Sequence, residues 1–224
     1  MSRRTVTLVA PAGLVPYAEA WELQRRWVAQ RRAGERPDTL LLLEHRPVIT
    51  LGRNADPRGV LAPPERLAAL GVEVHRVERG GQATYHGPGQ VVGYPILHLR
   101  PLGMGVRRYV DTLEEVMIRT ARVFGVDAYR VPGRPGAYCD RGKLGAVGVA
   151  VRAGVSFHGF AFNVCPDLSH FRLIVPCGLT DVAPTSLEAL RAPGPTPAEA
   201  REVLAESFAE AFGVDLQPER PPAR

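Results

Sequence analysis

Residues 143–164 read KLGAVGVAVRAGVSFHGFAFNV, and this stretch decides the fold class. Apolar side chains alternate with small or polar ones along 143–151 and again along 155–164. The two runs are separated by Arg152-Ala153-Gly154, which supplies the residue types of a tight turn. The pattern therefore predicts a β-hairpin, and with it an antiparallel sheet.

Further periodic segments flank the hairpin on both sides. Apolar runs of strand length predict strands, and apolar residues at helical spacing predict amphipathic helices. We expect strands over 39–44, 48–51, 72–77 and 91–99, and helices over 15–33, 109–124 and 197–212. Strands outnumber helices, so we predict an α+β fold, in which helices pack on a mixed, largely antiparallel sheet. One domain should span residues 1–217, and the Pro-rich residues 218–224 should form a frayed tail.

The composition is that of an ordinary globular protein. The chain has 224 residues and a formal net charge of +5, and no apolar stretch approaches the length of a membrane span. Its arginines are spread along the chain rather than gathered with aromatic residues, which argues against nucleic acid as a partner. No export signal follows Met1, so we expect a cytoplasmic protein whose three cysteines are free thiols.

Lysine occurs only once in the chain, at Lys143, and the other long cationic side chains are all arginine. Arginine cannot give up its proton in a protein, whereas a partly buried lysine can. Lys143 begins the first strand of the hairpin among small and apolar neighbours, and such surroundings disfavour a charged ammonium. We therefore interpret Lys143 as a proton-transfer residue.

Residues 79–90 read RGGQATYHGPGQ, a segment with too few apolar side chains for a core. Its glycines let the backbone approach a ligand closely. A phosphate-binding loop is the obvious alternative, but the segment has no Gly-Lys-Ser/Thr ending and no G-x-G-x-x-G sequence opening a helix. We predict a loop that cradles the substrate, and no ATP site.

Three cysteines are candidates for a nucleophile. Cys177 lies between Pro176 and Gly178, in a tight loop of the kind that holds a reactive group within reach of solvent. Cys165 ends an apolar strand and is expected to fill the core. Cys139 lies near the lysine in the sequence, and composition alone leaves it open. The cysteines and histidines lack Cys-x-x-Cys or His-x-x-x-His spacing, so we expect no metal site.

Four segments stand out together: residues 79–94 (RGGQATYHGPGQVVGY), Lys143 with Gly148, residues 156–164 (SFHGFAFNV) and residues 176–178 (PCG). In this combination they resemble one family, the octanoyltransferases of lipoate biosynthesis. The likeness runs in order through most of the chain. It implies a fold related to the catalytic domains of biotin ligases and lipoate ligases.

The resemblance also implies site residues. Cys177 falls on the family's acyl-thioester cysteine and Lys143 on the lysine that keeps this cysteine reactive, which makes Cys139 the weaker candidate. The implied substrate-binding residues form three strips: Arg79, Gly80, Gly81, Gln82, Ala83, Thr84, Tyr85 and His86; then Ala146, Val147 and Gly148; then Gly159, Phe160 and Ala161.

The reaction implied by the resemblance is acyl transfer in two steps. An octanoyl (or lipoyl) group passes from the phosphopantetheine thioester of acyl carrier protein to Cys177. It then passes to a lysine ε-amine on a lipoyl domain, in the E2 subunits of 2-oxoacid dehydrogenases or in the glycine cleavage H protein. Lys143 supplies and removes the protons. Because a thioester is already activated, we expect no ATP. We also expect no metal or other cofactor, and no membrane or nucleic acid partner.

Two other functions stay open on the sequence. Leu51-Gly52-Arg53-Asn54 is similar to the ATP-dependent lipoate ligases, although Cys177 and the Arg79-Gly80-Gly81-Gln82 form of the loop argue against that activity. A non-catalytic acyl-binding or carrier-binding module is the second alternative. Such a module would have no reason to keep a lone lysine together with a loop thiol.

Some side chains near these motifs have two possible roles. Val147, Phe157 and Phe160 could line a slot for an acyl tail or simply pack the core. His86 and His158 could order the site or make only structural hydrogen bonds. The sequence does not place the backbone N–H groups that would stabilise an oxyanion.

Overall fold

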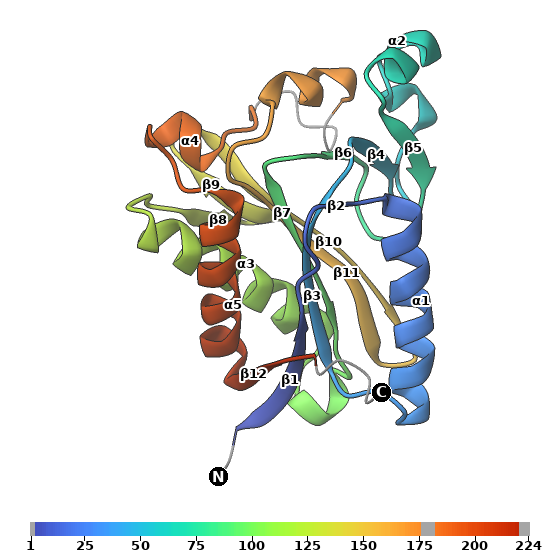
Figure 1. The fold of residues 1–224 in the computed structure, drawn as a ribbon, viewed down its shortest axis with the longest axis vertical. Coiled ribbons are helices and arrows are strands. Elements are labelled where there is room, and N and C mark those ends of the chain that lie inside the picture. Colours follow the sequence, from blue (N-terminus) through green and yellow to red (C-terminus); the bar gives the residue numbers. More distant parts are fainter. Residues whose placement is uncertain (1–2, 176–181, 220–224) are drawn as a thin grey trace.

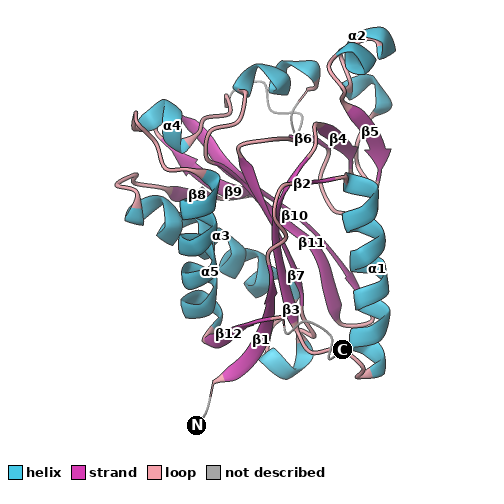
Figure 2. Cartoon of the chain, in the orientation of Figure 1, coloured by secondary structure: helices cyan, strands magenta, loops and turns pink. Residues whose placement is uncertain are grey.

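The computed structural model describes residues 3–175 and 182–219 of the chain. Figure 2 shows strands through the middle of the molecule and helices on the outside. The strands are β1 (Arg4–Val9), β2 (Leu14–Val15), β3 (Thr39–His45), β4 (Val48–Leu51), β5 (Glu73–Arg76), β6 (Ala83–His86), β7 (Gln90–Ile96), β8 (Tyr129–Val131), β9 (Arg134–Cys139), β10 (Gly142–Arg152), β11 (Val155–Asn163) and β12 (Val214–Pro218). The helices are α1 (Tyr17–Ala33), α2 (Pro64–Ala69), α3 (Val106–Val123), α4 (Leu187–Leu190) and α5 (Pro197–Phe212), with 3-10 turns η1 (Pro57–Gly59), η2 (Arg100–Leu102) and η3 (Leu168–Leu173).

One large sheet organises the part of the chain that the structure describes. Its strand order is β12-β1-β3-β7-β11-β10-β9-β8, with β2 paired to β3. β1 pairs in parallel with both β12 and β3, whereas each successive pair from β3 through β8 is antiparallel. Helices pack on this sheet, so the predicted α+β class with a mixed, largely antiparallel sheet is confirmed.

The predicted hairpin is formed by β10 and β11. The two strands pair without interruption from Gly145–Phe162 to Arg152–Val155. The two residues between them, Ala153 and Gly154, have φ angles of 47° and 82°. Positive φ at both positions is characteristic of a type I′ turn, whose twist matches that of the paired strands. The turn therefore fixes the register of the longest strand pair in the fold.

The three long helices lie close to their predicted positions. α1 begins two residues later than expected and ends at Gly34, whose φ of 79° closes the helix. α3 begins at Val106, three residues earlier than expected. α5 has the predicted bounds, because the Thr196 side chain and Glu199 form a capping box at its start.

The large sheet separates two buried layers. Along β3, Leu40 and Leu42 belong to the layer under α3 and α5, whereas Leu41 and Leu43 belong to the layer under α1. Figure 1 shows α1 on one side of the sheet and α3 with α5 on the other. Successive side chains of a strand point to opposite faces, so both faces of the sheet are covered.

A smaller sheet, with the order β5-β4-β6, lies beside the large one near α2 (Figure 1). It has its own apolar cluster, in which Ile49 and Tyr85 pack against Leu173. Only residues 87–89 separate β6 from β7 of the large sheet. This short connection holds the glycine-rich segment close to the large sheet.

The two strands at the far edge of the sheet, β1 and β12, were not predicted from the sequence. β12 is short and partly exposed, and it ends in a proline, which argues against a strand. Pro218, the expected first residue of the tail, is the last residue of β12 and pairs with Leu8. Residues 220–224 of the expected tail lie outside the described range. None of the described helices is both long and apolar enough to cross a membrane.

Candidate active site

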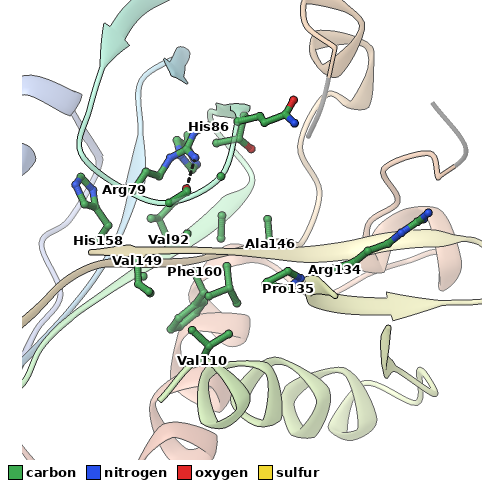
Figure 3. Close-up of a pocket in the computed structure, with 18 of the residues that line it drawn as sticks. Arg79, His86, Val92, Val110, Arg134, Pro135, Ala146, Val149, His158 and Phe160 are labelled. Carbon is green, nitrogen blue, oxygen red and sulfur yellow. Dashed lines mark hydrogen bonds between the residues drawn. The ribbon is translucent and has the colours of Figure 1, made fainter. Parts of the chain in front are cut away.

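A cavity of about 390 Å³ lies where the small sheet meets β10 and β11. Its volume is in the range of small-ligand sites. Figure 3 shows lining residues on both sides of these strands: Arg79, His86 and His158 on one side, and Phe160 and Val110 on the other. The cavity therefore has a polar wall and an apolar wall.

The glycine-rich loop forms one side of the cavity by docking on an open edge of β10. β9 pairs with β10 only as far as Gly136 and Ala146. Beyond this point the Gly80 N–H donates to Val149 O at 2.9 Å. On the other side of the loop, three backbone N–H groups of residues 52–54 donate to carbonyls of the loop: Gly52 to Gln82, Arg53 to Arg79 and Asn54 to Gly81. The first four of the eight predicted loop residues, Arg79 to Gln82, all line the cavity.

The Arg79 side chain is buried, with 7% of its surface exposed. Its guanidinium donates to Thr50 O at 2.7 Å and to Thr50 Oγ1 at 2.8 Å. It also donates to Gly80 O at 3.0 Å. A guanidinium keeps its charge in a protein, so Arg79 gives the cavity a fixed positive charge beside the loop.

The other two predicted strips lie side by side. Ala146, Val147 and Gly148 of β10 are the cross-strand partners of Ala161, Phe160 and Gly159 of β11, and all six residues line the cavity. Phe160 also packs in the layer under α3, so it serves both roles that the sequence left open. Phe157 packs in the opposite layer and does not line the cavity.

The other four predicted loop residues, 83–86, form β6, and their side chains alternate between two environments. Thr84 and His86 line the cavity. Ala83 and Tyr85 point to the opposite face and pack in the cluster of the small sheet. The Tyr85 hydroxyl lies 2.7 Å from Nδ1 of His170. Ala83 and Tyr85 therefore do not line the cavity, contrary to expectation, and instead pack β6 in place.

Lys143 lies in the wall of the cavity near the start of β10. Its Nζ donates to Pro135 O at 3.1 Å and lies 5.1 Å from the centroid of the Tyr138 ring. Gly136 makes room for the side chain, because a Cβ at Gly136 would lie 2.8 Å from Lys143 Cε. The backbone of Lys143 also makes two hydrogen bonds to residues 183–185. The Lys143 N–H donates to Ala183 O at 2.9 Å, and the Thr185 N–H donates to Lys143 O at 3.0 Å.

The polar wall is built from aromatic and imidazole rings. Tyr17 of α1 stacks on His86 at 6.3 Å between ring centroids, and the Tyr94 hydroxyl lies 2.7 Å from Nε2 of His45. Burial lowers the pKa of His86 to about 3 and that of His45 to about 4, and it also lowers the pKa of His158. These imidazoles are neutral at physiological pH, because desolvation disfavours the charged form.

Several lining residues were not assigned to the site from the sequence. They are Tyr17, Asn54, Val92, Tyr94, Val110, Gly133, Arg134, Pro135, Tyr138 and Val149. Tyr94 and Asn54 lie within motifs that the sequence did single out. Tyr138 could have been found only from the pairing of β9 with β10, which places it opposite Lys143.

The described thiols are poor candidates for a nucleophile. Cys139 is buried in the apolar layer under α3. Burial raises the pKa of Cys165, which favours the inert thiol. Cys177 lies outside the described residues. Among the described residues, no three His, Cys, Asp or Glu side chains gather as a metal site would require.

The fold is the one found in the catalytic domains of lipoate ligases and biotin ligases. A bipartite lipoate protein ligase from Thermoplasma acidophilum superposes with a TM-score of 0.74 at 17% identity, covering 98% of this chain and 87% of that one. Lipoate-protein ligase A bound with ATP superposes with a TM-score of 0.70 at 19% identity, covering 98% and 89%. At these identities the likeness establishes the fold alone.

The sequence relatives are closer. Octanoyltransferases from Acidobacterium capsulatum and Chloroflexus aurantiacus are 47% identical over 216 residues and 48% identical over 215 residues. The matches cover 90% and 95% of this chain, and 88% and 96% of the relatives. The family model of the lipoyl protein ligase A/B catalytic domain matches residues 16–209. The chain belongs to this family, within its octanoyltransferase branch, and is an acyltransferase.

Proposed function

We propose that this chain transfers an octanoyl group from the thioester of acyl carrier protein to the ε-amine of a lipoyl-domain lysine, through an octanoyl thioester on Cys177. One observation carries the proposal: Lys143, the single lysine, lies in the wall of a cavity formed by the glycine-rich loop and the two paired strips. The identity of 47–48% to octanoyltransferases supports the choice of acyl group.

The apolar wall suits the acyl tail. Val110, Val147 and Phe160 contribute aliphatic and aromatic surface to this wall of the cavity. Burying an alkyl chain against such surface is favourable by roughly 25 cal/mol per Å² of apolar area. The tail would thus lie between the paired strips and α3, with its carbonyl end toward Lys143.

The short stretch of sequence between Cys177 and Val182, a residue beside Lys143, supports the pairing of Cys177 with Lys143. A smaller cavity adjoins the main one, and Val182 lines it together with Lys143. Val182 follows Cys177 by five residues, a stretch that spans at most about 18 Å when fully extended. The backbone bonds of Lys143 to residues 183–185 anchor this return of the chain beside the lysine.

The first step moves the acyl group onto the enzyme. The Cys177 thiolate attacks the thioester carbonyl, a new carbon–sulfur bond forms, and the bond to the phosphopantetheine sulfur breaks. The Lys143 ammonium gives its proton to the departing thiolate. The products are octanoyl-Cys177, free carrier thiol and neutral Lys143.

The second step moves the acyl group to the acceptor. The neutral ε-amine of the acceptor lysine attacks the carbonyl of octanoyl-Cys177, the amide bond forms, and the bond to the Cys177 sulfur breaks. Lys143 takes a proton from the nitrogen, which restores the ammonium beside a thiolate. Because the thioester is already activated, the cycle needs neither ATP nor metal.

The acceptors that fit this chemistry are lipoyl domains of E2 subunits and of the glycine cleavage H protein. The structure from Thermoplasma acidophilum comes from a study of a ligase and its E2 lipoyl domain, which supports a lipoyl domain as a partner for this fold. We extend that partner to this chain as part of the proposal, with reaction in the cytoplasm.

Trapping the intermediate tests the proposal. The full chain is incubated with octanoyl-acyl carrier protein alone, digested, and analysed by tandem mass spectrometry. We expect one octanoyl group on Cys177, and none after Cys177→Ser. An octanoyl group on Cys139 or Cys165 would contradict the assignment. Release of pyrophosphate from ATP with free lipoate would favour a lipoate ligase instead.

A further inference from the structure

A buried series of hydrogen-bonded polar side chains starts at the cavity and runs across the ends of β7 and β11. His86 Nδ1 lies 2.7 Å from Gln90 Oε1, Gln90 Nε2 lies 2.9 Å from Asn163 Oδ1, and Asn163 Nδ2 lies 2.9 Å from Thr185 O. Each of the four residues is no more than 7% exposed. Gln90 and Asn163 are direct cross-strand partners at the ends of β7 and β11.

A backbone carbonyl fixes which group donates and which accepts in each of these hydrogen bonds. Thr185 O can only accept, so the Asn163 amide nitrogen donates to it and Asn163 Oδ1 is left as an acceptor. Gln90 must then donate to Asn163, and the same Gln90 nitrogen lies 3.3 Å from a second carbonyl, Tyr85 O. Gln90 Oε1 is therefore an acceptor, and the proton between it and His86 belongs to His86 Nδ1.

This fixes the tautomer of His86. In a neutral imidazole with a proton on Nδ1, Nε2 carries a lone pair and can only accept. Burial lowers the pKa of His86 to about 3, and the neighbouring groups His45, Arg79 and His158 also disfavour its charge. The ring is held in place by Tyr17 stacked on it.

Nε2 of His86 has no hydrogen bond to any of the described residues, and the side chain lines the cavity (Figure 3). An acceptor that opens onto the cavity in this way can take a donor from the substrate. An octanoyl tail has no donor, whereas the attacking amine has N–H groups. The phosphopantetheine arm also has N–H groups, but it takes part only in the first half-reaction, which the second test below measures separately. Thr84, which shares β6 with His86, lines both this cavity and the smaller one with Lys143.

We propose that Nε2 of His86 accepts an N–H hydrogen bond from the ε-amine of the acceptor lysine and so holds the amine for attack on the acyl group. This inference rests on the proposed function. Gln90 and Asn163 are positioning residues, because they act by keeping the His86 proton on Nδ1. The arrangement favours a primary amine over a carboxylate, which has only acceptors to offer.

The first test measures the tautomer directly. Nitrogen-15 shifts of the histidine rings are recorded on the full chain between about pH 5 and pH 8, a range that spans ordinary histidine titration. We expect His86 to stay neutral with its proton on Nδ1 throughout. A proton on Nε2, or titration within this range, would overturn the inference.

The second test separates the two half-reactions in single turnover. His86→Asn keeps an amide nitrogen near Nδ1 but removes the Nε2 acceptor, whereas His86→Gln returns an amide near Nε2. We expect His86→Asn to form octanoyl-enzyme at the wild-type rate and to pass the group to a lipoyl domain at least about tenfold more slowly. His86→Gln should recover part of the loss.

The control is His98→Asn, at a histidine beside the β10–β11 turn that does not line the cavity. It should leave both half-reactions unchanged. Equal losses in both half-reactions of His86→Asn, or no loss in either, would overturn the role in holding the amine. If the wild-type chain forms no octanoyl-enzyme, the proposed function itself fails, and the tautomer measurement still decides whether Nε2 is an acceptor.

Discussion

The two faces of the large sheet are both buried, but by different kinds of side chain. Under α3 and α5 the layer is apolar, with Leu113, Met117 and Phe208 fully buried. Under α1 and the small sheet, apolar packing gives way near the cavity to neutral imidazoles, tyrosine hydroxyls and paired amides. The face under α3 and α5 supplies apolar packing and the apolar wall of the cavity, whereas the other face uses buried polar groups to build the polar wall. Substitutions on the two faces should therefore affect different quantities.

The largest effect is expected at the cavity, from Lys143→Arg. Arginine keeps the positive charge but cannot release a proton, so kcat should fall by about 10²–10⁴-fold, the usual contribution of proton transfer. The melting temperature should change little. Steady-state kinetics and thermal unfolding check both parts. The reverse exchange at the exposed neighbour, Arg141→Lys, is the matched control and should leave kcat unchanged.

On the apolar face, Phe208→Ala should act on stability alone. Phe208 is fully buried and stacks on Phe212 at 4.3 Å between ring centroids. The free energy of unfolding should fall by about 3–5 kcal/mol, as for other buried aromatic truncations. Denaturant unfolding measures this loss. A kcat per folded molecule that drops together with stability would show that the two faces are not separate in function.

The polar face should make stability depend on pH. Burial lowers the pKa of His45 to about 4 and that of His86 to about 3, below the ordinary histidine value of about 6.5. Below pH 6.5 the unfolded chain therefore binds protons that the folded chain does not, and the free energy of unfolding falls as the pH drops. The slope should reach about 1.4 kcal/mol per pH unit for each histidine.

Urea unfolding between about pH 6.5 and pH 5 measures that slope, in a range above most carboxylate titration. His86→Asn should make it shallower, because one of the buried imidazoles is removed. A free energy of unfolding that is flat over this range would show that the buried imidazoles are protonated in the fold.

The smallest effect is expected at the N-terminus of α5, where the capping residues Thr196 and Glu199 do not line the cavity. Thr196→Ala removes the side-chain acceptor of the Glu199 N–H and half of the capping box. The free energy of unfolding should fall by about 1 kcal/mol. Activity should be unchanged, and a loss of activity would mean that α5 transmits strain to the cavity.

The elements with strong periodicity could be predicted from the sequence. The β10–β11 hairpin and α5 follow from alternation and from capping residues, which are local signals. β1 and β12 could not be predicted, because their pairing depends on chain ends far apart in the sequence. Lys143 stood out by composition alone.

Other parts of the site depend on three-dimensional neighbours. The division of β6 into cavity-facing Thr84 and His86 and inward-packed Ala83 and Tyr85 follows from which face the small sheet turns to the cavity. The link from His86 to Asn163 joins residues 77 positions apart in the chain. No single segment carries a signal for such a link, because the register of β7 with β11 creates it.

The central claim is acyl transfer without adenylation, and a complete reaction tests it most directly. The full chain is incubated with octanoyl-acyl carrier protein and a purified lipoyl domain in the absence of ATP, and the lipoyl domain is weighed by intact mass spectrometry. We predict one octanoyl group on the lipoyl-domain lysine with the wild-type chain, and none with Cys177→Ser. Modification of the lipoyl domain only when ATP and a free acid are supplied would contradict the account.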